Sequence, residues 1–135
     1  MQTSLQALEF CEQNHISVLC TDLPLNRSLS GRLNGGNFIA IDERDMTERE
    51  KKTHLWHEIG HCATGAFYDP YTPLETRSRC ENRANRWAVK KLLPRIRLEK
   101  AMQGGAVEIW QLAELFNVDE KLVRFALQYY FGKAM

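Results

Sequence analysis

The chain has 135 residues with 18 basic and 17 acidic side chains, so its formal net charge of +1 gives no overall attraction to nucleic acid or to an anionic membrane. This length fits a single domain, and a composition that is 44% apolar is sufficient for a hydrophobic core without disulfide staples. No apolar run approaches the roughly 18 residues of a membrane span, and the opening residues lack the charged and apolar regions of a signal peptide. Because the four cysteines also lack CxxC spacing, we expect a reduced, cytoplasmic protein that is not inserted in a membrane.

The N-terminal third is predicted to hold one short helix and three strands. Apolar residues recur at helical spacing in a first helix that ends near Asn14. Residues 16–20 (ISVLC) are then a β-branched run of strand length. In residues 28–42 (SLSGRLNGGNFIAID), Asn34 and Gly35 form a tight-turn signal between two arms that carry apolar residues. We therefore expect a small antiparallel sheet of about three strands.

Two longer helices follow the strands. Thr47 and Glu50 form a capping box, and the helix that they begin can run unbroken to Gly65, a typical C-terminal stop. Residues 72–75 (TPLE) combine a threonine cap, a proline at the first helical position and a glutamate three residues beyond the cap. This second helix should run toward Leu93 and be interrupted or end at Pro94, because proline disfavours the helical conformation for the residue that precedes it.

The remaining residues predict a helical tail. Residues 94–103 form a short basic stretch that stops at Gly104, and residues 106–131 read as two helices joined at residues 117–119. These two helices resemble the end of a helix-turn-helix, which raises the possibility of DNA binding. The would-be recognition helix has few side chains able to read base edges, namely Lys121, Arg124 and Gln128, so a packing or docking role is favoured over DNA binding.

A histidine-rich stretch, HLWHEIGHC (54–62), holds the strongest chemical signal. His57 and His61 are four positions apart, so both imidazoles emerge from one helix face and can share one metal ion. Glu58 is one step round the helix and can lie beside the ion as a proton acceptor, as the HExxH pattern requires. His54 lies about 10 Å along the axis from His61 at ~1.5 Å per residue, too far to join the same ion, and is expected at the surface or supporting the site.

The third ligand must come from another segment, and the second helix offers one. Glu81, Ala84, Asn85 and Ala88 fall on one stripe of small and polar residues. The alanines allow a close approach of the two helices, so that Glu81 could reach the ion and Asn85 could hydrogen-bond a ligand imidazole. The alternative is a solvent-facing glutamate and a capping asparagine, and Glu75 is a weaker candidate ligand that its place in the helix cap explains better.

The combination resembles the ImmA/IrrE family of metallopeptidases. The resemblance is carried by HEIGH (57–61) and by ENRANRWAVKKLLP (81–94), which is similar to the family's E-x-x-A-N-x-[FW]-A-x-x-L-L-x-P signature, and it extends more weakly over most of the chain. It implies a zincin-like, gluzincin-type minidomain with Zn²⁺ as cofactor, His57, His61 and Glu81 as zinc ligands and Glu58 as the catalytic residue. Arg83 departs from the acidic residue that the family often has before the Ala-Asn pair, which alters charge near the cleft and leaves the ligand set unchanged.

The resemblance also implies a partner, because members of the family cleave or inactivate helix-turn-helix repressors of phages and mobile elements. We therefore expect a zinc-dependent endopeptidase that acts on such a protein. The rival interpretation is a non-catalytic, zinc-stabilised protein-interaction or DNA-binding regulator. A structural zinc site is usually closed by four protein ligands, and the sequence offers no convincing fourth.

The expected fold class is α+β, mostly helical, in one domain. Residues 1–93 would form the catalytic part with the sheet and the two zinc-site helices, and residues 94–135 a tail that ends in a helical hairpin. Candidates for stabilising the oxyanion of the reaction are Tyr68, Tyr71 and His54. Residues 38–41 (FIAI) precede the first zinc-site helix, and if they form a sheet edge they could align an extended substrate by strand addition; the alternative is an ordinary core strand.

Overall fold

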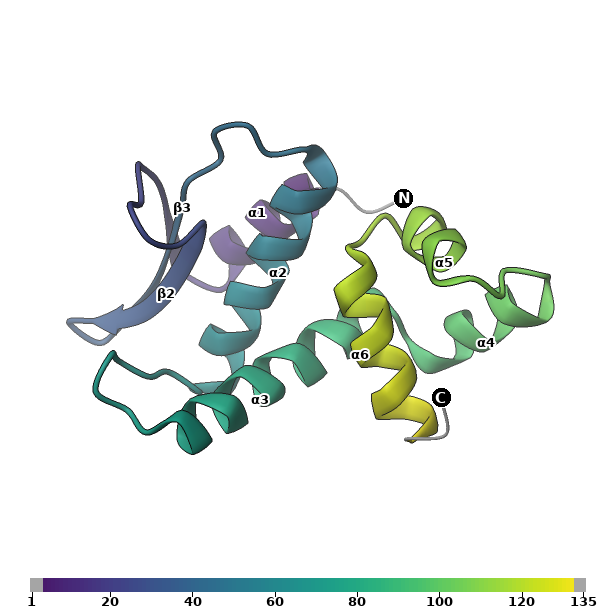
Figure 1. Ribbon diagram of the computed structural model, residues 1–135. Helices are drawn as coiled ribbons and strands as arrows, with labels where there is room; N and C mark the ends of the chain where they lie inside the picture. The colour runs from purple at the N-terminus through teal and green to yellow at the C-terminus, as the bar shows by residue number, and fades with distance from the viewer. Residues whose placement is uncertain (1–3, 133–135) are drawn as a thin grey trace.

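The structure is a computed structural model that describes residues 4–132. In Figure 1 helix α2 runs through the middle of the molecule, with β2 and β3 on one side and helices α4 to α6 on the other. The mostly helical α+β fold expected from the sequence is confirmed. None of the helices in the described part of the chain is long and apolar enough to cross a membrane. The elements are α1 (Ser4–Gln13), β1 (Ile16–Cys20), β2 (Ser28–Leu33), β3 (Gly36–Ile41), α2 (Glu48–Thr64), α3 (Leu74–Leu92), α4 (Arg95–Gln103), α5 (Ile109–Phe116) and α6 (Glu120–Phe131).

The three strands form one mixed sheet in the order β1-β3-β2. β2 and β3 make the predicted antiparallel hairpin, with Asn34 and Gly35 at the positive φ of 53° and 80° that a tight hairpin turn needs. The expectation of a wholly antiparallel sheet is wrong, because β1 pairs with β3 in parallel. The chain passes from β1 to the far edge of the sheet before the hairpin returns it, so that β3 runs beside β1 in the same direction.

This strand order changes which strand offers a free edge. β3 is the central strand, with its backbone bonded on both sides, so the hypothesis that residues 38–41 offer a sheet edge is wrong and the alternative of a core strand is correct. The edge strand beside the site is β2, which pairs with β3 on one side only and packs against α2.

Helix α2 begins and ends as its sequence predicts. The Thr47 hydroxyl accepts the N–H of Glu50 at 3.1 Å, and the Glu50 carboxylate accepts the N–H of Thr47 at 2.8 Å, which completes the capping box. Gly65 ends the helix in the left-handed conformation at φ 70°, and its N–H bonds to the carbonyl of His61. Both ends of the helix that carries the histidines are therefore held by local interactions.

The N-terminus of α3 differs from its prediction. Pro73 is the cap residue, and no side chain caps the helix. The Thr72 hydroxyl accepts the N–H of Asp69 at 3.1 Å and lies 3.2 Å from its carboxylate, while Glu75 pairs with Arg79 at 2.6 Å. The predicted capping box at Thr72 is wrong because the preceding turn already uses its hydroxyl. The end of the helix at Leu92, two residues before Pro94, is confirmed.

The tail packs on the same core as helices α2 and α3. Buried side chains of α2, β3, α5 and α6 belong to one hydrophobic cluster, among them Leu55, Ile39, Leu112 and Val123. Helices α5 and α6 form the expected hairpin around Asn117, which ends α5 in the left-handed conformation. A further link is polar: the buried Lys52 of α2 donates to the carbonyl of Phe116 in the last turn of α5 at 2.9 Å.

Candidate metal centre

Three side chains from two helices converge on one point. His57 and His61 of α2 present their Nε2 atoms 3.2 Å apart, and the two carboxylate oxygens of Glu81 of α3 lie 3.0 Å and 2.9 Å from them. Two ligands of a tetrahedral zinc ion, each at about 2.0–2.1 Å from it, are separated by about 3.3 Å. The three side chains form the one candidate metal cluster among the described residues.

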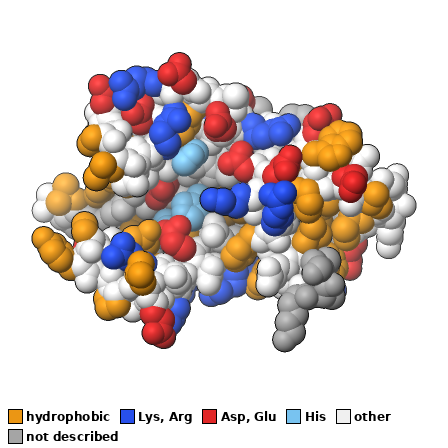
Figure 2. Space-filling model, viewed as in Figure 1, with side chains coloured by type: hydrophobic (Ala, Val, Ile, Leu, Met, Phe, Trp, Pro, Cys, Tyr) orange, Lys and Arg blue, Asp and Glu red, His pale blue; other side chains and the backbone are white. Residues whose placement is uncertain are grey.

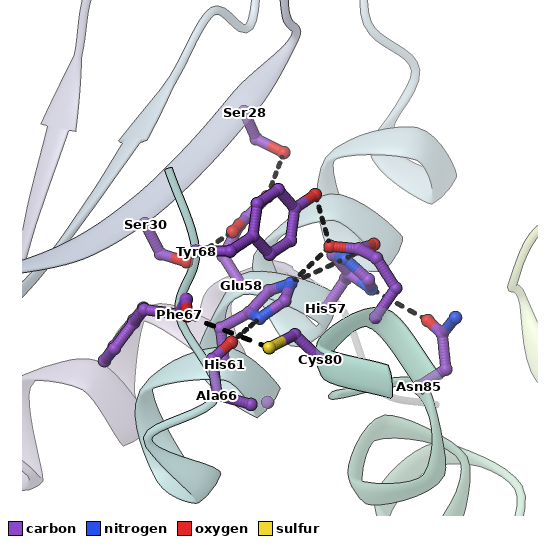
Figure 3. A network of polar contacts seen from close by, with 12 residues as sticks. Ser28, Ser30, His57, Glu58, His61, Ala66, Phe67, Tyr68, Cys80 and Asn85 are labelled. Carbon is purple, nitrogen blue, oxygen red and sulfur yellow. Dashed lines mark hydrogen bonds and ion pairs between the residues drawn. The ribbon is translucent and has the colours of Figure 1, made fainter. Parts of the chain in front are cut away.

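The outer nitrogens of both histidines are held by hydrogen bonds (Figure 3). The Nδ1 of His61 lies 2.6 Å from the carbonyl oxygen of Ala66, which can only accept, so that Nδ1 carries a proton. The Nδ1 of His57 lies 2.8 Å from the amide oxygen of Asn85. Both rings are therefore fixed with Nε2 as the free nitrogen, directed toward the other ring and toward Glu81.

This arrangement fits a bound cation. Two nitrogen lone pairs and two carboxylate oxygens face one another at contacts of about 3 Å, and a divalent ion satisfies them together. Protons compete for the same nitrogens. Burial disfavours the charged forms of both His57 and Glu81. The hydrogen bonds and opposite charges within the cluster outweigh burial, so the pKa of Glu81 is lowered far below its ordinary range and the pKa of His57 is raised.

Tyr68 stands at the edge of this cluster. Its hydroxyl donates to the Oε2 of Glu81 at 2.9 Å. Burial, followed by this hydrogen bond, raises the pKa of Tyr68 to about 12, so the phenol stays protonated at neutral pH. Tyr71, by contrast, is 93% exposed and is not among the residues that line the adjoining cleft.

Glu58 lies outside the metal cluster, between α2 and the edge strand β2. Its side chain is buried, and its two carboxylate oxygens accept one hydroxyl each: Ser28 at 2.8 Å and Ser30 at 2.6 Å (Figure 3). The Nδ1 of His54 lies 2.8 Å from the oxygen of Ser28, so His54 supports the surroundings of Glu58 rather than the metal cluster. The hydroxyls come from the same face of β2, because side chains two positions apart on a strand point the same way.

A cleft of about 520 Å³ opens beside these groups. Its walls include Leu29 of β2, Phe67 and Tyr68 of the loop after α2, and Arg77 of α3, while Glu58, His61 and Glu81 contribute to its lining. Figure 2 shows histidine side chains in a hollow of this face, with acidic and basic side chains around it. An open cleft next to the metal cluster leaves room for a substrate.

Three residues that hydrogen-bond the candidate site residues were not identified from the sequence. Ser28 and Ser30 carry a weak signal, a pair of hydroxyls at alternate strand positions, but nothing local indicates that Glu58 faces them. The sequence signal for the carbonyl of Ala66 is stronger. Gly65 ends the helix with a left-handed turn, and this turn directs the carbonyl of the next residue toward His61.

The site has the layout of an HExxH metallopeptidase: two histidines on one helix, a glutamate from a second helix and a separate carboxylate beside them. Residues 11–128 match the family model of peptidase M78, described as the IrrE N-terminal-like domain, and the chain belongs to this family. The match confirms the resemblance to the ImmA/IrrE metallopeptidases. No curated protein and no solved structure gave a significant match.

Proposed function

We propose that the protein is a zinc-dependent endopeptidase that hydrolyses a peptide bond in a specific protein substrate. The observation that carries this proposal is the position of Glu58. It follows His57 directly in the chain, yet its carboxylate lines the cleft and takes no part in the metal cluster. A carboxylate beside a candidate metal site and at the wall of a cleft can accept a proton from water, which a purely structural site does not need.

The donor set supports zinc. Imidazole nitrogen and carboxylate oxygen are common zinc ligands, and catalytic zinc sites usually have three protein ligands and one open position. Within residues 4–132 no fourth histidine, cysteine, aspartate or glutamate joins His57, His61 and Glu81. When bound, zinc would polarise the substrate carbonyl and lower the pKa of water to roughly 7.

The protein's own groups would handle the protons and the developing charge. Glu58 would accept the proton of the attacking water and deliver it to the leaving amine. Among the three candidates for stabilising the oxyanion, Tyr68 is favoured, because it is a protonated phenol at the rim of the metal cluster. Tyr68 also lines the cleft, whereas neither Tyr71, which is 93% exposed, nor His54 is among the residues that line it.

The substrate that we propose is a helix-turn-helix repressor of a phage or mobile element in the cytoplasm. The family membership supports this class of substrate, and the four cysteines, none in a disulfide, agree with a reducing compartment. An extended peptide would pair with the outer edge of β2, whose Ser28, Leu29 and Ser30 line the cleft.

Substitution of the proposed base tests the function. The chain is co-expressed with repressors encoded beside its gene, and truncated products are identified by mass spectrometry. We expect Glu58→Gln to abolish the truncated products, with a loss of at least about 100-fold in rate, and to retain one metal ion per chain. Glu75→Gln is the matched control, because that exposed glutamate pairs with Arg79, away from the candidate metal cluster, and the change should leave both metal content and cleavage unchanged.

Cleavage that persists in Glu58→Gln would contradict the proposal. If the variant retains its metal, forms no truncated product and still inactivates the repressor as fully as the wild-type chain, the protein acts by binding, and the non-catalytic alternative is correct. The two results are distinguished by measuring truncated product and repressor activity in the same cells.

A further inference from the structure

The buried carboxylate of Glu58 is held by neutral groups. Its residue is 6% exposed, and among residues 4–132 no lysine or arginine forms an ion pair with it. A buried carboxylate without a cationic partner depends on hydrogen bonds for compensation. Each of its two oxygens receives one such bond from β2, at 2.8 Å from Ser28 and 2.6 Å from Ser30.

The directions of these bonds determine the state of His54. A serine hydroxyl has one hydrogen, and Ser28 uses it on the carboxylate of Glu58. The contact of 2.8 Å between Ser28 and the Nδ1 of His54 must therefore have the imidazole as the donor. A directional chain results, from His54 through Ser28 to Glu58, and it prevents rotation of the Ser28 hydroxyl away from the carboxylate.

We propose that Ser28 and Ser30 are positioning residues for Glu58, and that His54 orients the Ser28 hydroxyl. This inference rests on the proposed role of Glu58 as the proton acceptor. A glutamate side chain has three rotatable bonds, and a proton acceptor is effective only when held within hydrogen-bond reach of the water. Because β2 lines the cleft as well as holding the carboxylate, one strand sets the distance between the base and a peptide lying along that strand.

A simpler interpretation is that the two hydroxyls only satisfy a buried polar group. In that case their loss would lower stability and leave the direction of Glu58 unchanged. The readout must therefore report on the side chains themselves, and it must not require a known substrate. NMR spectroscopy of the full-length chain, loaded with zinc and also free of it, meets both requirements.

The first arm follows His54 by its imidazole ¹⁵N shifts at pH 7.5, where burial lowers the pKa of His54 and keeps the ring neutral. The wild-type chain should show the tautomer protonated at Nδ1. Ser28→Ala removes the acceptor, so the Nε2-protonated tautomer should appear, whereas Ser30→Ala, two positions along the same strand, should leave the His54 shifts unchanged. An unchanged His54 spectrum in Ser28→Ala would overturn the chain of bonds.

The second arm follows the side-chain carboxyl ¹³C signal of Glu58, identified by its absence in Glu58→Gln. Both serine-to-alanine variants should shift and broaden it, and Ser30→Thr, which keeps the hydroxyl, should restore it. Ser17→Ala is the control, because this exposed serine lies on β1 and should change neither signal. An unaltered Glu58 signal in both alanine variants would overturn the positioning role.

The third arm measures cleavage of the repressor by chains that retain one zinc ion each. Ser28→Ala and Ser30→Ala should lower kcat by about 10-fold to 100-fold and change KM by less than about twofold, since a small misplacement of a catalytic group has effects of this size. An unchanged kcat in both variants would overturn the inference. If the wild-type chain forms no truncated product, the proposed function fails, and if Glu58→Gln keeps its cleavage activity, the role of Glu58 as proton acceptor fails. In either case the two spectroscopic arms still decide whether the serines hold the carboxylate.

Discussion

Asn85 is not one of the three candidate metal ligands, yet its hydrogen bond decides which nitrogen of His57 is free to bind a metal. A neutral imidazole carries its proton on one of two nitrogens, and the amide oxygen 2.8 Å from Nδ1 selects that position. His61 obtains the same result from a backbone carbonyl, which no substitution of a side chain removes. Asn85 is therefore the position at which this control can be tested.

We expect Asn85→Ala to weaken zinc binding by about 10-fold to 100-fold, because His57 loses both its fixed tautomer and its fixed ring orientation. Asn85→Asp keeps an oxygen acceptor and should retain most of the affinity. The measurement is competition with a chromophoric chelator at neutral pH. Asn82→Ala, on the exposed face of the same helix, is the control, and an affinity for Asn85→Ala equal to that of this control would contradict the expectation.

At the scale of elements, the site depends on how closely α2 and α3 approach each other. Gly60 of α2 faces the backbone of α3, and a β-carbon there would lie 2.5 Å from the carbonyl oxygen of Ala84. A backbone carbonyl in a helix cannot move aside as a flexible side chain can. The spacing that brings Glu81 to the histidines therefore requires a glycine at this position.

Gly60→Ala tests this packing through the sign of its effect. At an exposed helix position, a change from glycine to alanine would raise the free energy of unfolding by about 1 kcal/mol. Here the added methyl group would force α2 and α3 apart, which should lower the free energy of unfolding by about 1–3 kcal/mol. Zinc affinity should fall as well, because α3 carries Glu81. Urea denaturation and chelator competition measure the two effects. Gly36→Ala, where the nearest atom would lie at an ordinary 3.7 Å, should change neither, and a stabilising effect of Gly60→Ala would refute the packing argument.

At the scale of the whole molecule, the tail and the metal site share one hydrophobic core. Lys52 bonds to the carbonyl of Phe116, and Arg49 bonds to the side chain of Asn117 at 3.2 Å, so α2 is connected to the end of α5 by two polar contacts. The apolar side chains of α5 and α6 continue the cluster that surrounds the helix of the histidines. We therefore expect the tail and the metal site to unfold together.

Leu112→Ala measures this coupling. Leu112 is 1% exposed, so its truncation should cost about 2–5 kcal/mol of the free energy of unfolding. Zinc release is monitored with a chromophoric chelator, and loss of helix is monitored by circular dichroism. Both should occur in one urea transition, at a lower midpoint than in the wild-type chain. Leu115→Ala in the same helix is the matched control, because that leucine is 56% exposed. Two separate transitions would show that residues 94–135 form an independent unit.

Local patterns predicted the parts of the fold that depend on neighbouring residues. The capping box at Thr47, the stop at Gly65 and the turn at Asn34 and Gly35 all formed as their sequence indicates. The same kind of pattern failed at Thr72, whose hydroxyl is held by Asp69, because two local motifs compete there for one group. A capping motif shows which hydrogen bonds a residue is able to make, and the neighbouring residues decide which of them form.

The sequence by itself determined that one helix presents His57 and His61 on a common face, because a spacing of four residues is converted to a position by the helix geometry alone. It also indicated Glu81, through a stripe of small residues and a family resemblance, although nothing local requires that helix to lie against the first. Only the tertiary structure decided that β1 joins the sheet in parallel, that β2 is the edge strand and that Ser28 and Ser30 face Glu58. These relations join residues about 20 to 30 positions apart, and they follow from how the whole chain buries its apolar surface, which no short stretch of sequence encodes.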